Sequence, residues 1–166
     1  LRPQEIANNP EVARRIGVIA MNTAIECDIY GNVNSSHICG TKLMNGIGGS
    51  CDFARSGFLS VFFTNSLAKK GAISSVVKFC SHIDHSEHDV SVLVSERGVA
   101  DLRGLSPKER APFIIDNIAN PIYQPELKDY FERACKACGN SQTPHILSEA
   151  FDMYERLAKT GTMQKK

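Results

Sequence analysis

The stretch from residue 44 to residue 50 is the part of this sequence whose residue types most directly suggest chemistry. It reads MNGIGGS, with glycine at positions 46, 48 and 49. Glycine adopts positive φ without strain and lets backbone amides approach a ligand closely, so such a loop can hold a phosphate or stabilise an oxyanion. The loop lacks the Lys-Ser/Thr pair of a P-loop and matches the dinucleotide-binding fingerprint poorly. Spacing alone therefore leaves a plain tight loop as an equal alternative.

A second candidate is the polar segment 81–89, in which His82, His85 and His88 recur every third residue with Asp84 and other acidic side chains between them. These are the residue types of a metal site, and on a helix three histidines at this spacing would share one side. The segment also lies between two expected strands and is dense in polar residues. A solvated loop, or the rim of an active site, is therefore the favoured interpretation.

Charged residues follow the expected strands at two further places. Lys69 and Lys70 precede Gly71 and could contact a phosphate near the glycine-rich loop, although exposed lysines in a turn are by default only solvated. Glu96 follows a strand expected over residues 90–94, and open α/β sheets place ligands at the carboxyl ends of their strands. An ordinary surface glutamate fits the sequence equally well.

The six cysteines are scattered along the chain rather than arranged as a disulfide scaffold, so we expect reduced thiols in an intracellular compartment. The only C-x-x-C pair is Cys135 and Cys138, in a segment where Leu127, Tyr130 and Ala134 mark the apolar face of a helix. A redox pair would be expected at a helix amino end after a strand, and a zinc ribbon would need a second pair. Core packing is therefore the preferred interpretation.

Start, stop and periodicity signals predict the elements that must position these residues. Asn9 and Pro10 begin a helix that Gly17 ends, and Ser106 begins another through a capping box. Strands are expected over residues 18–21, 24–29, 37–39, 58–63, 73–79 and 90–94, and further helices over residues 52–56, 125–138 and 143–158. Strands first and helices afterwards indicate an α/β fold with an open sheet covered by helices. Residues 159–166 are expected to fray.

The amino-acid composition argues against two classes of partner, nucleic acids and membranes. The chain has 166 residues, is 42% hydrophobic and carries 19 Lys and Arg against 18 Asp and Glu, for a net charge of +1. It can bury one core and lacks the basic excess of a nucleic-acid binder. Its apolar runs are far shorter than the roughly 20 residues of a membrane span, and no signal-peptide pattern is present. We therefore expect no nucleic-acid or membrane partner.

Several segments, in order along the chain, resemble the acetyl-CoA hydrolase/transferase family. They are GVIAMNTAIE (17–26), DIYGNVN (28–34), GIGGSCDF (46–53), SHIDHSEHDV (81–90) and SERGVADLRG (95–104). The last two are most similar to CoA-transferases that act on acetate and succinate. The resemblance covers about residues 3–155. It implies the open-sheet α/β fold of the carboxyl-terminal domain of class I CoA-transferases, over residues 1–158 and incomplete at its amino end.

The chemistry that the resemblance implies is transfer of CoA between an acyl-CoA, succinyl-CoA or acetyl-CoA, and a short carboxylate, acetate or succinate, through a glutamyl-CoA thioester. On the family pattern the Gly49 amide stabilises the oxyanion, while Asn8 and Glu96 support the active site. The implied contacts to CoA come from Ile25, Asn45, Gly49 and Lys69. The resemblance implies no metal and no cofactor beyond the substrate CoA.

The family's nucleophilic glutamate has no counterpart here, because in the family it lies upstream of the helix that opens this chain. The chain also begins with Leu1 rather than Met. We therefore expect the last portion of a longer transferase, inactive alone, whose partners are its missing amino-terminal portion and a second copy in a homodimer. Cys51 departs from the pattern, since glycine is common there.

Two functional alternatives stay open on the sequence. Water as the final acceptor would make the parent protein an acyl-CoA hydrolase, and a chain without catalysis would be a CoA-binding module. The compartment is equally open between a mitochondrion or related organelle and a bacterial cytoplasm, since both suit reduced cysteines.

Overall fold

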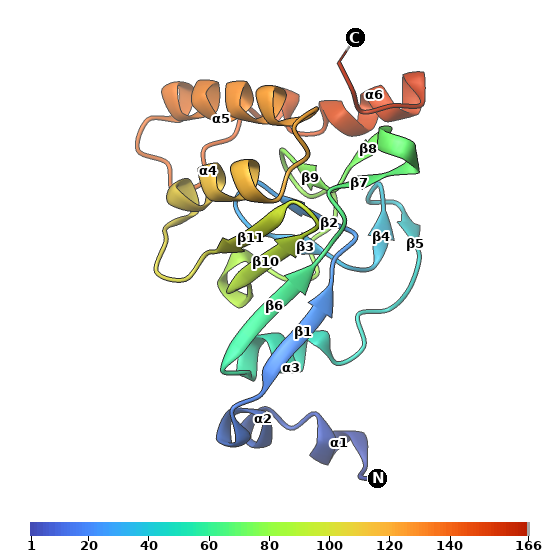
Figure 1. Ribbon diagram of the computed structural model, residues 1–166, viewed down its shortest axis with the longest axis vertical. Helices are drawn as coiled ribbons and strands as arrows, with labels where there is room; N and C mark the ends of the chain where they lie inside the picture. The colour runs from blue at the N-terminus through green and yellow to red at the C-terminus, as the bar shows by residue number, and fades with distance from the viewer. Residues whose placement is uncertain (166) are drawn as a thin grey trace.

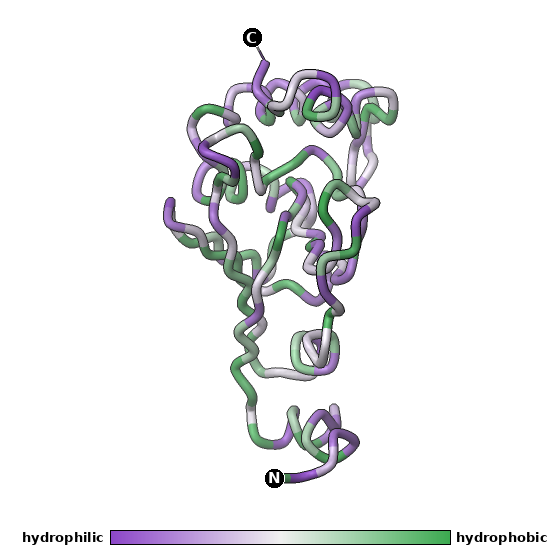
Figure 2. The backbone as a smooth tube through the Cα atoms, turned by 90° about the vertical axis from the view of Figure 1, so that its right-hand side faces the viewer, coloured by the Kyte–Doolittle hydropathy of each residue, from purple (hydrophilic) through white to green (hydrophobic). Residues whose placement is uncertain are grey.

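The amino-terminal segment forms two short helices in the computed structural model, which describes residues 1–165. They are α1 (Gln4–Ala7) and α2 (Pro10–Ile16). The Asn9 side chain accepts hydrogen bonds from first-turn amides of α2, and Gly17 ends the helix with a φ of 68°, as the sequence predicts. Both helices lie at the narrow end of an elongated molecule (Figure 1), and the side view in Figure 2 shows the N- and C-terminal ends at opposite extremes.

The central sheet has four strands in the order β1-β6-β10-β11. They are β1 (Ile19–Thr23), β6 (Leu59–Phe63), β10 (Val92–Ser95) and β11 (Gly98–Asp101). The first three run parallel, and β11 is antiparallel to β10. The sequence predicts these three strands but not β11, which follows a tight turn and buries only the Ala100 side chain. The parallel strands bring their carboxyl ends to one edge of the sheet.

A smaller sheet lies beside the first, in the order β3-β2-β9. It comprises β2 (Glu26–Asp28), β3 (Val33–Asn34) and β9 (Val76–Val77), and two hairpins accompany it: β4 (His37–Ile38) with β5 (Lys42–Leu43), and β7 (Leu67–Ala68) with β8 (Ile73–Ser74). The single strand expected over residues 73–79 is therefore wrong. The Ser74 hydroxyl donates to the Val76 carbonyl at 2.7 Å, and this local bond accompanies the change from one sheet to the other.

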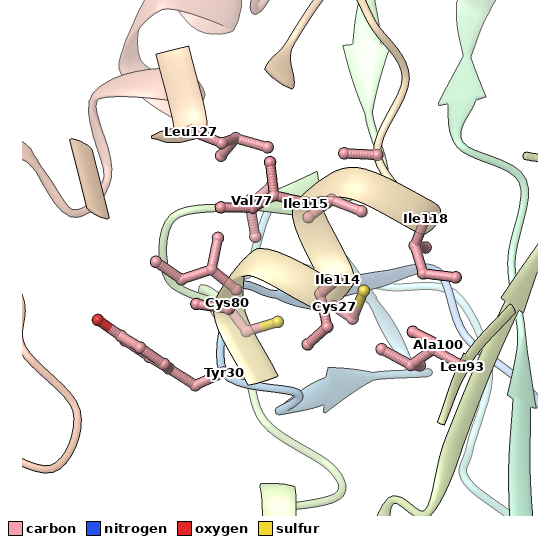
Figure 3. Close-up of a cluster of buried hydrophobic side chains, with 14 of the residues drawn as sticks. Cys27, Tyr30, Val77, Cys80, Leu93, Ala100, Ile114, Ile115, Ile118 and Leu127 are labelled. Carbon is pink, nitrogen blue, oxygen red and sulfur yellow. The ribbon is translucent and has the colours of Figure 1, made fainter. Parts of the chain in front are cut away.

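Helices cover one side of this assembly. They are α3 (Ser50–Ser56), α4 (Pro107–Asn117), α5 (Gln124–Cys138) and α6 (Asp152–Thr160). Figure 3 shows Ile114 and Ile115 of α4, and Ile118 at its C-cap, packed among side chains of both sheets and of α5. These three isoleucines are fully buried, as their helical spacing predicts. The fold is thus the expected α/β arrangement, with open sheets and a helical cover.

The end of the chain differs from the expectations. The single helix predicted over residues 143–158 is interrupted: a 3₁₀ turn (Leu147–Glu149) precedes α6, and the Pro144 carbonyl accepts a hydrogen bond from the Tyr30 hydroxyl. Within the segment expected to fray, α6 continues through Thr160 and the Met163 side chain is fully buried. Lys166 lies outside the described residues.

The cysteines are free thiols, as predicted. Cys135 and Cys138 lie in the last turn of α5, where Leu127, Tyr130 and Ala134 are buried as the spacing predicts. Cys138 itself is half-buried and donates to the His145 carbonyl at 3.3 Å, so it packs at the margin of the core rather than inside it.

Candidate functional site

A depression of about 460 Å³ opens where the parallel strands of the central sheet end. Its lining comes from the ends of β1, β6 and β10 and the residues that follow them: Thr23, Ala24, Phe63, Thr64, Asn65, Val94, Ser95 and Glu96. Open α/β sheets bind ligands in this position because the loops that leave the strands diverge there and carry polar groups. We call it the strand-end depression.

Glu96 stands in the strand-end depression with its carboxylate fixed by Ser66. The Ser66 N–H donates to one carboxylate oxygen at 2.8 Å and the Ser66 hydroxyl donates to the other, while Asn120 donates to that hydroxyl at 3.3 Å. Partial burial alone would raise the pKa of Glu96, but the two Ser66 donors outweigh it and lower the pKa. Glu96 is therefore an oriented, ionised carboxylate.

The glycine-rich loop leads into α3, with Gly49 as the helix N-cap. A side chain at position 49 would collide with Asn8 Nδ2, which also donates to Asp52 at 3.5 Å. Within residues 1–165 the backbone N–H groups of residues 46–49 donate to no protein acceptor. A run of unpaired amides at a helix start is suited to stabilising negative charge. Asn8 lies directly against the Gly49 N-cap.

Asn45 shapes the start of this loop. Its Nδ2 donates to the carbonyls of Ser35 and Gly46, at 3.0 Å each, and its backbone amide donates to the Ser36 carbonyl at 3.4 Å. Asn45 lines a shallow depression of about 290 Å³ together with Thr23, which also lines the strand-end depression. The loop and the strand ends are therefore adjacent parts of one surface.

Ile25 and Lys69 line a third cavity, of about 240 Å³, which we call the Lys69 pocket. Its other lining residues are mostly apolar: Glu26, Ile38, Cys39, Met44, Ala68, Ile73, Ser74, Ser75 and Met163. An apolar pocket with one lysine at its wall suits a ligand that has an extended apolar part and an anionic end.

The buried carboxylate of Glu26 lies in the wall of the Lys69 pocket. Burial raises its pKa, against the opposing hydrogen bonds from Asn34 at 2.9 Å, Tyr154 at 2.8 Å and Ser81 at 3.2 Å. These donors tie β2 to β3, to α6 and to the loop after β9. Glu26 therefore has a structural role, because its carboxylate connects these segments in the wall of the pocket.

The histidine segment does not gather into a ligand set. His85 is buried and its Nε2 lies 3.0 Å from Ser50 Oγ at the start of α3, whereas His82 pairs with Asp84 at 3.1 Å and His88 with Glu87 at 3.3 Å. Among residues 1–165 no group of three or more His, Cys, Asp or Glu side chains is placed to hold a metal ion. The segment instead contacts the end of the glycine-rich loop through His85 and Ser50.

The structure thus groups the residues implied by the resemblance into three adjacent places. Asn8 meets Gly49, Ile25 shares a pocket with Lys69, and Asn45 connects the loop to the strand ends; Glu96 lies apart from Gly49, in the strand-end depression. Sequence reasoning missed Ser66 and Met163. A serine in a loop and a methionine near the chain end carry no local signal for these roles. In the described part of the chain no helix has the length and apolar character needed to cross a bilayer.

Comparisons with known proteins add four findings on sequence. The family described as "Acetyl-CoA hydrolase/transferase C-terminal domain" matches residues 1–131. The succinyl-CoA:acetate CoA-transferase of Clostridium kluyveri is 61% identical over 164 residues, which cover 99% of this chain and 30% of that protein. The propanoyl-CoA:succinate CoA transferase of Escherichia coli is 55% identical, with 98% and 32% covered. The acetyl-CoA hydrolase of Schizosaccharomyces pombe is 48% identical, with 99% and 33% covered.

The chain therefore spans about a third of the length of the curated relatives it matches. Solved structures agree on the fold. RipA from Yersinia pestis superimposes with a TM-score of 0.67 at 29% identity, over 83% of this chain and 30% of that one. The 4-hydroxybutyrate CoA-transferase from Porphyromonas gingivalis gives 0.61 at 29% identity, over 80% and 31%. The predicted fold class is confirmed.

Proposed function

The chain belongs to the acetyl-CoA hydrolase/transferase family, and from this premise we propose that it is the carboxyl-terminal part of a CoA-transferase. The proposed reaction moves CoA from succinyl-CoA or acetyl-CoA to a short carboxylate, acetate or succinate. Two relatives named as CoA transferases are 61% and 55% identical over nearly the whole chain, which supports this choice.

The observation that carries the proposal is the run of unpaired amides at residues 46–49, with Asn8 seated against Gly49. When a glutamate carboxylate attacks the acyl-CoA thioester, the carbonyl oxygen gains negative charge. Collapse of this adduct expels the CoA thiolate and leaves a mixed anhydride, which the thiolate reopens at the glutamyl carbonyl to give glutamyl-CoA and the free acid. An acceptor carboxylate then reverses the sequence. Amides already aimed at the oxyanion lower the barrier of each addition.

The remaining residues receive roles that fit their surroundings. Lys69 and Ile25 hold part of CoA in the Lys69 pocket, with the ammonium facing an anionic group, and Asn45 contacts CoA from the glycine-rich loop. Glu96, ionised and oriented by Ser66, supports the active site from the strand-end depression. No metal ion takes part in the proposed reaction.

The nucleophilic glutamate lies outside this chain in the proposal, so the active unit requires further polypeptide. The relatives are about three times as long, and the family description places this region at the carboxyl-terminal end. We propose that the preceding portion of such a protein supplies the glutamate and that the complete enzyme is a homodimer. The 166 residues alone are then expected to give no CoA transfer, and measurable turnover by them would contradict the missing-nucleophile argument.

The test of the function compares two glycines of one loop in the complete enzyme. Gly49→Ala forces a methyl group against Asn8, whereas a side chain at Gly46 meets nothing within 4 Å. The variant keeps the Gly49 N–H but displaces it or Asn8 from their present positions, and complete loss of one aligned oxyanion donor costs about 100-fold or more in kcat. We therefore expect a kcat loss of up to about 100-fold for Gly49→Ala and near wild-type kcat for Gly46→Ala. Equal kcat in the two variants would show that the packing of Asn8 against Gly49 does not matter for the reaction.

A second candidate is hydrolysis of acetyl-CoA, favoured by the relative of that name at 48% identity. The same site would serve it, with water as the acceptor. Assaying acetyl-CoA consumption with and without succinate separates the two: a transferase forms succinyl-CoA and needs the acceptor, and a hydrolase releases free CoA without it. A complete protein that binds CoA but turns over neither way would be a CoA-binding module.

A further inference from the structure

The turn that carries Lys69 has an unusual backbone. Lys69 and Lys70 both lie in the left-handed region, with φ of 47° and 55°. Among the described residues only Cys39, with φ of 50°, is a further non-glycine residue in this region, and Cys39 lines the same pocket as Lys69. Such a conformation costs about 1 kcal/mol or more per residue, and it persists only where surrounding contacts enforce it.

The contacts that enforce it come from the far end of the chain. The turn joins β7 to β8, and residues 162–164 lie against its backbone. The Met163 amide donates to the Ala72 carbonyl at 2.7 Å, and the Thr162 hydroxyl donates to the same carbonyl at 3.3 Å. Gln164 Nε2 donates to the Gly71 carbonyl at 3.0 Å. We call residues 162–164 the clamp.

The clamp also forms part of the Lys69 pocket itself. The Met163 side chain is fully buried and lines the pocket together with residues of β2 and β4. The Tyr123 hydroxyl donates to the Gly71 carbonyl at 2.9 Å, so this carbonyl is held from two directions. The segment therefore holds the backbone of the turn by hydrogen bonds and lines the pocket through one side chain.

We propose that the clamp is a positioning device for CoA binding: it holds the Lys69 turn in its strained conformation, so that the ammonium is presented at the pocket before CoA arrives. This rests on the proposed role of Lys69 in binding CoA. Met163, Thr162 and Gln164 act through the position of Lys69. Preorganisation of this kind lowers the free energy that the ligand must supply to order its site.

The test measures kcat and KM for the acyl-CoA in the complete enzyme. Met163→Ala is expected to raise KM about tenfold, roughly 1.4 kcal/mol, with kcat within about twofold. Gln164→Ala removes one hydrogen bond without opening a cavity, and is expected to raise KM about threefold. Met163→Leu keeps the volume and restores the wild-type KM.

Met153 provides the matched control, because it is as buried as Met163 but lies in α6 and does not line the pocket. Met153→Ala loses the same side chain and is expected to leave KM unchanged. An equal rise in KM for Met153→Ala, or an unchanged KM for both Met163→Ala and Gln164→Ala, would overturn the clamp.

The double variant Lys69→Ala/Met163→Ala separates this inference from the function beneath it. Without Lys69 the clamp has no ammonium to position, so the second substitution is expected to add less than about twofold to KM. Full additivity would show that Met163 acts independently of Lys69 and would overturn the clamp. An unchanged KM in the single variant Lys69→Ala would instead remove the lysine from CoA binding, and with it the proposed role on which the clamp depends.

Discussion

The two faces of the central sheet carry similar residue types in different surroundings. The row Asn22, Phe62, Leu93 and Ala100, defined by the strand register, points to one face, and its last three side chains are 0% exposed. The neighbouring row, Thr23, Phe63, Val94 and Val99, points to the other face, where Phe63 is 39% and Val99 58% exposed. We call these the covered and the open face.

The difference between them lies in what is packed on each. Helix α3 contacts β1 and β6, α4 contacts β11, and the smaller sheet completes the covered side. On the open face Ile19 and Met21 of β1 are 54% and 70% exposed. Sheets of parallel strands are normally buried on both faces, so apolar residues on both sides indicate a sheet built for two layers. The described residues cover this second face only at its centre, where Val61 and Val92 are 8% and 9% exposed.

The largest predicted difference in stability between the two faces is at the adjacent residues Phe62 and Phe63. Phe62→Ala on the covered face creates a cavity and is expected to lower the free energy of unfolding of the 166-residue chain by about 3–5 kcal/mol. Phe63→Ala on the open face removes a side chain already in contact with solvent, and is expected to cost about 1 kcal/mol or less. Urea denaturation measures both. An equal loss in the free energy of unfolding in the two variants would show that Phe63 is as well packed as Phe62.

A buried lysine and an exposed lysine, each paired with carboxylates, give a second comparison of buried and exposed sites. Lys78 is fully buried, 2.6 Å from Asp152 and 3.1 Å from Glu126, whereas Lys128 meets Asp116 at 2.6 Å with both side chains about half exposed. Lys78→Ala leaves carboxylates without their buried partner and is expected to cost about 3 kcal/mol. Lys128→Ala is expected to cost under about 0.5 kcal/mol. Thermal unfolding compares them, and a costly Lys128→Ala would reject the argument from burial.

The open face should behave differently in the short chain and in the complete enzyme. We expect the double variant Met21→Ser/Val99→Thr to change the stability of the 166-residue chain by under about 0.5 kcal/mol. In the complete enzyme we expect a loss of about 1–2 kcal/mol, because we propose that the preceding portion of the protein covers this face. Calorimetry measures the stability change in both proteins. The same small change in each would show that the open face is exposed to solvent in the complete enzyme as well.

The smallest predicted effect is the pH dependence of stability that His145 causes. Burial lowers the pKa of His145 to about 4, among the rings of Tyr30 and Phe79. In the unfolded chain a histidine has a pKa of about 6.5, so below that pH the unfolded state binds a proton that the folded state does not. The folded state therefore has its full stability above about pH 6.5 and loses stability as the pH falls towards 4. Because the ring is partly accessible, we expect about 1 kcal/mol.

Denaturation at pH 7 and pH 4.5 measures this loss. His145→Gln should remove that part of the pH dependence, while His88→Gln, at a side chain 78% exposed, should keep it. An unchanged pH dependence in His145→Gln would assign the effect to another group.

Local signals account for much of the fold. The Asn9 cap, the Gly17 stop and the Ser106–Glu109 capping box each depend on residues within one turn, and the structure confirms them. The strand β11 and the division of residues 73–79 were not predictable in this way, because each depends on which distant strand is available for pairing. The glycine-rich loop was visible in sequence, but its unpaired amides are a property of the folded loop.

The amino-acid sequence is sufficient to identify the family, the α/β class, the apolar and polar pattern of the strands, and the loop at residues 44–50. Three features depend on the folded chain: Ser66 orients Glu96, Met163 reaches the Lys69 pocket, and one sheet face is largely open. The two groups of features differ in the distance along the chain between the residues involved. Capping and periodicity act between residues a few positions apart, whereas Ser66 lies 30 residues from Glu96. Contacts of that kind exist only once packing has brought the segments together.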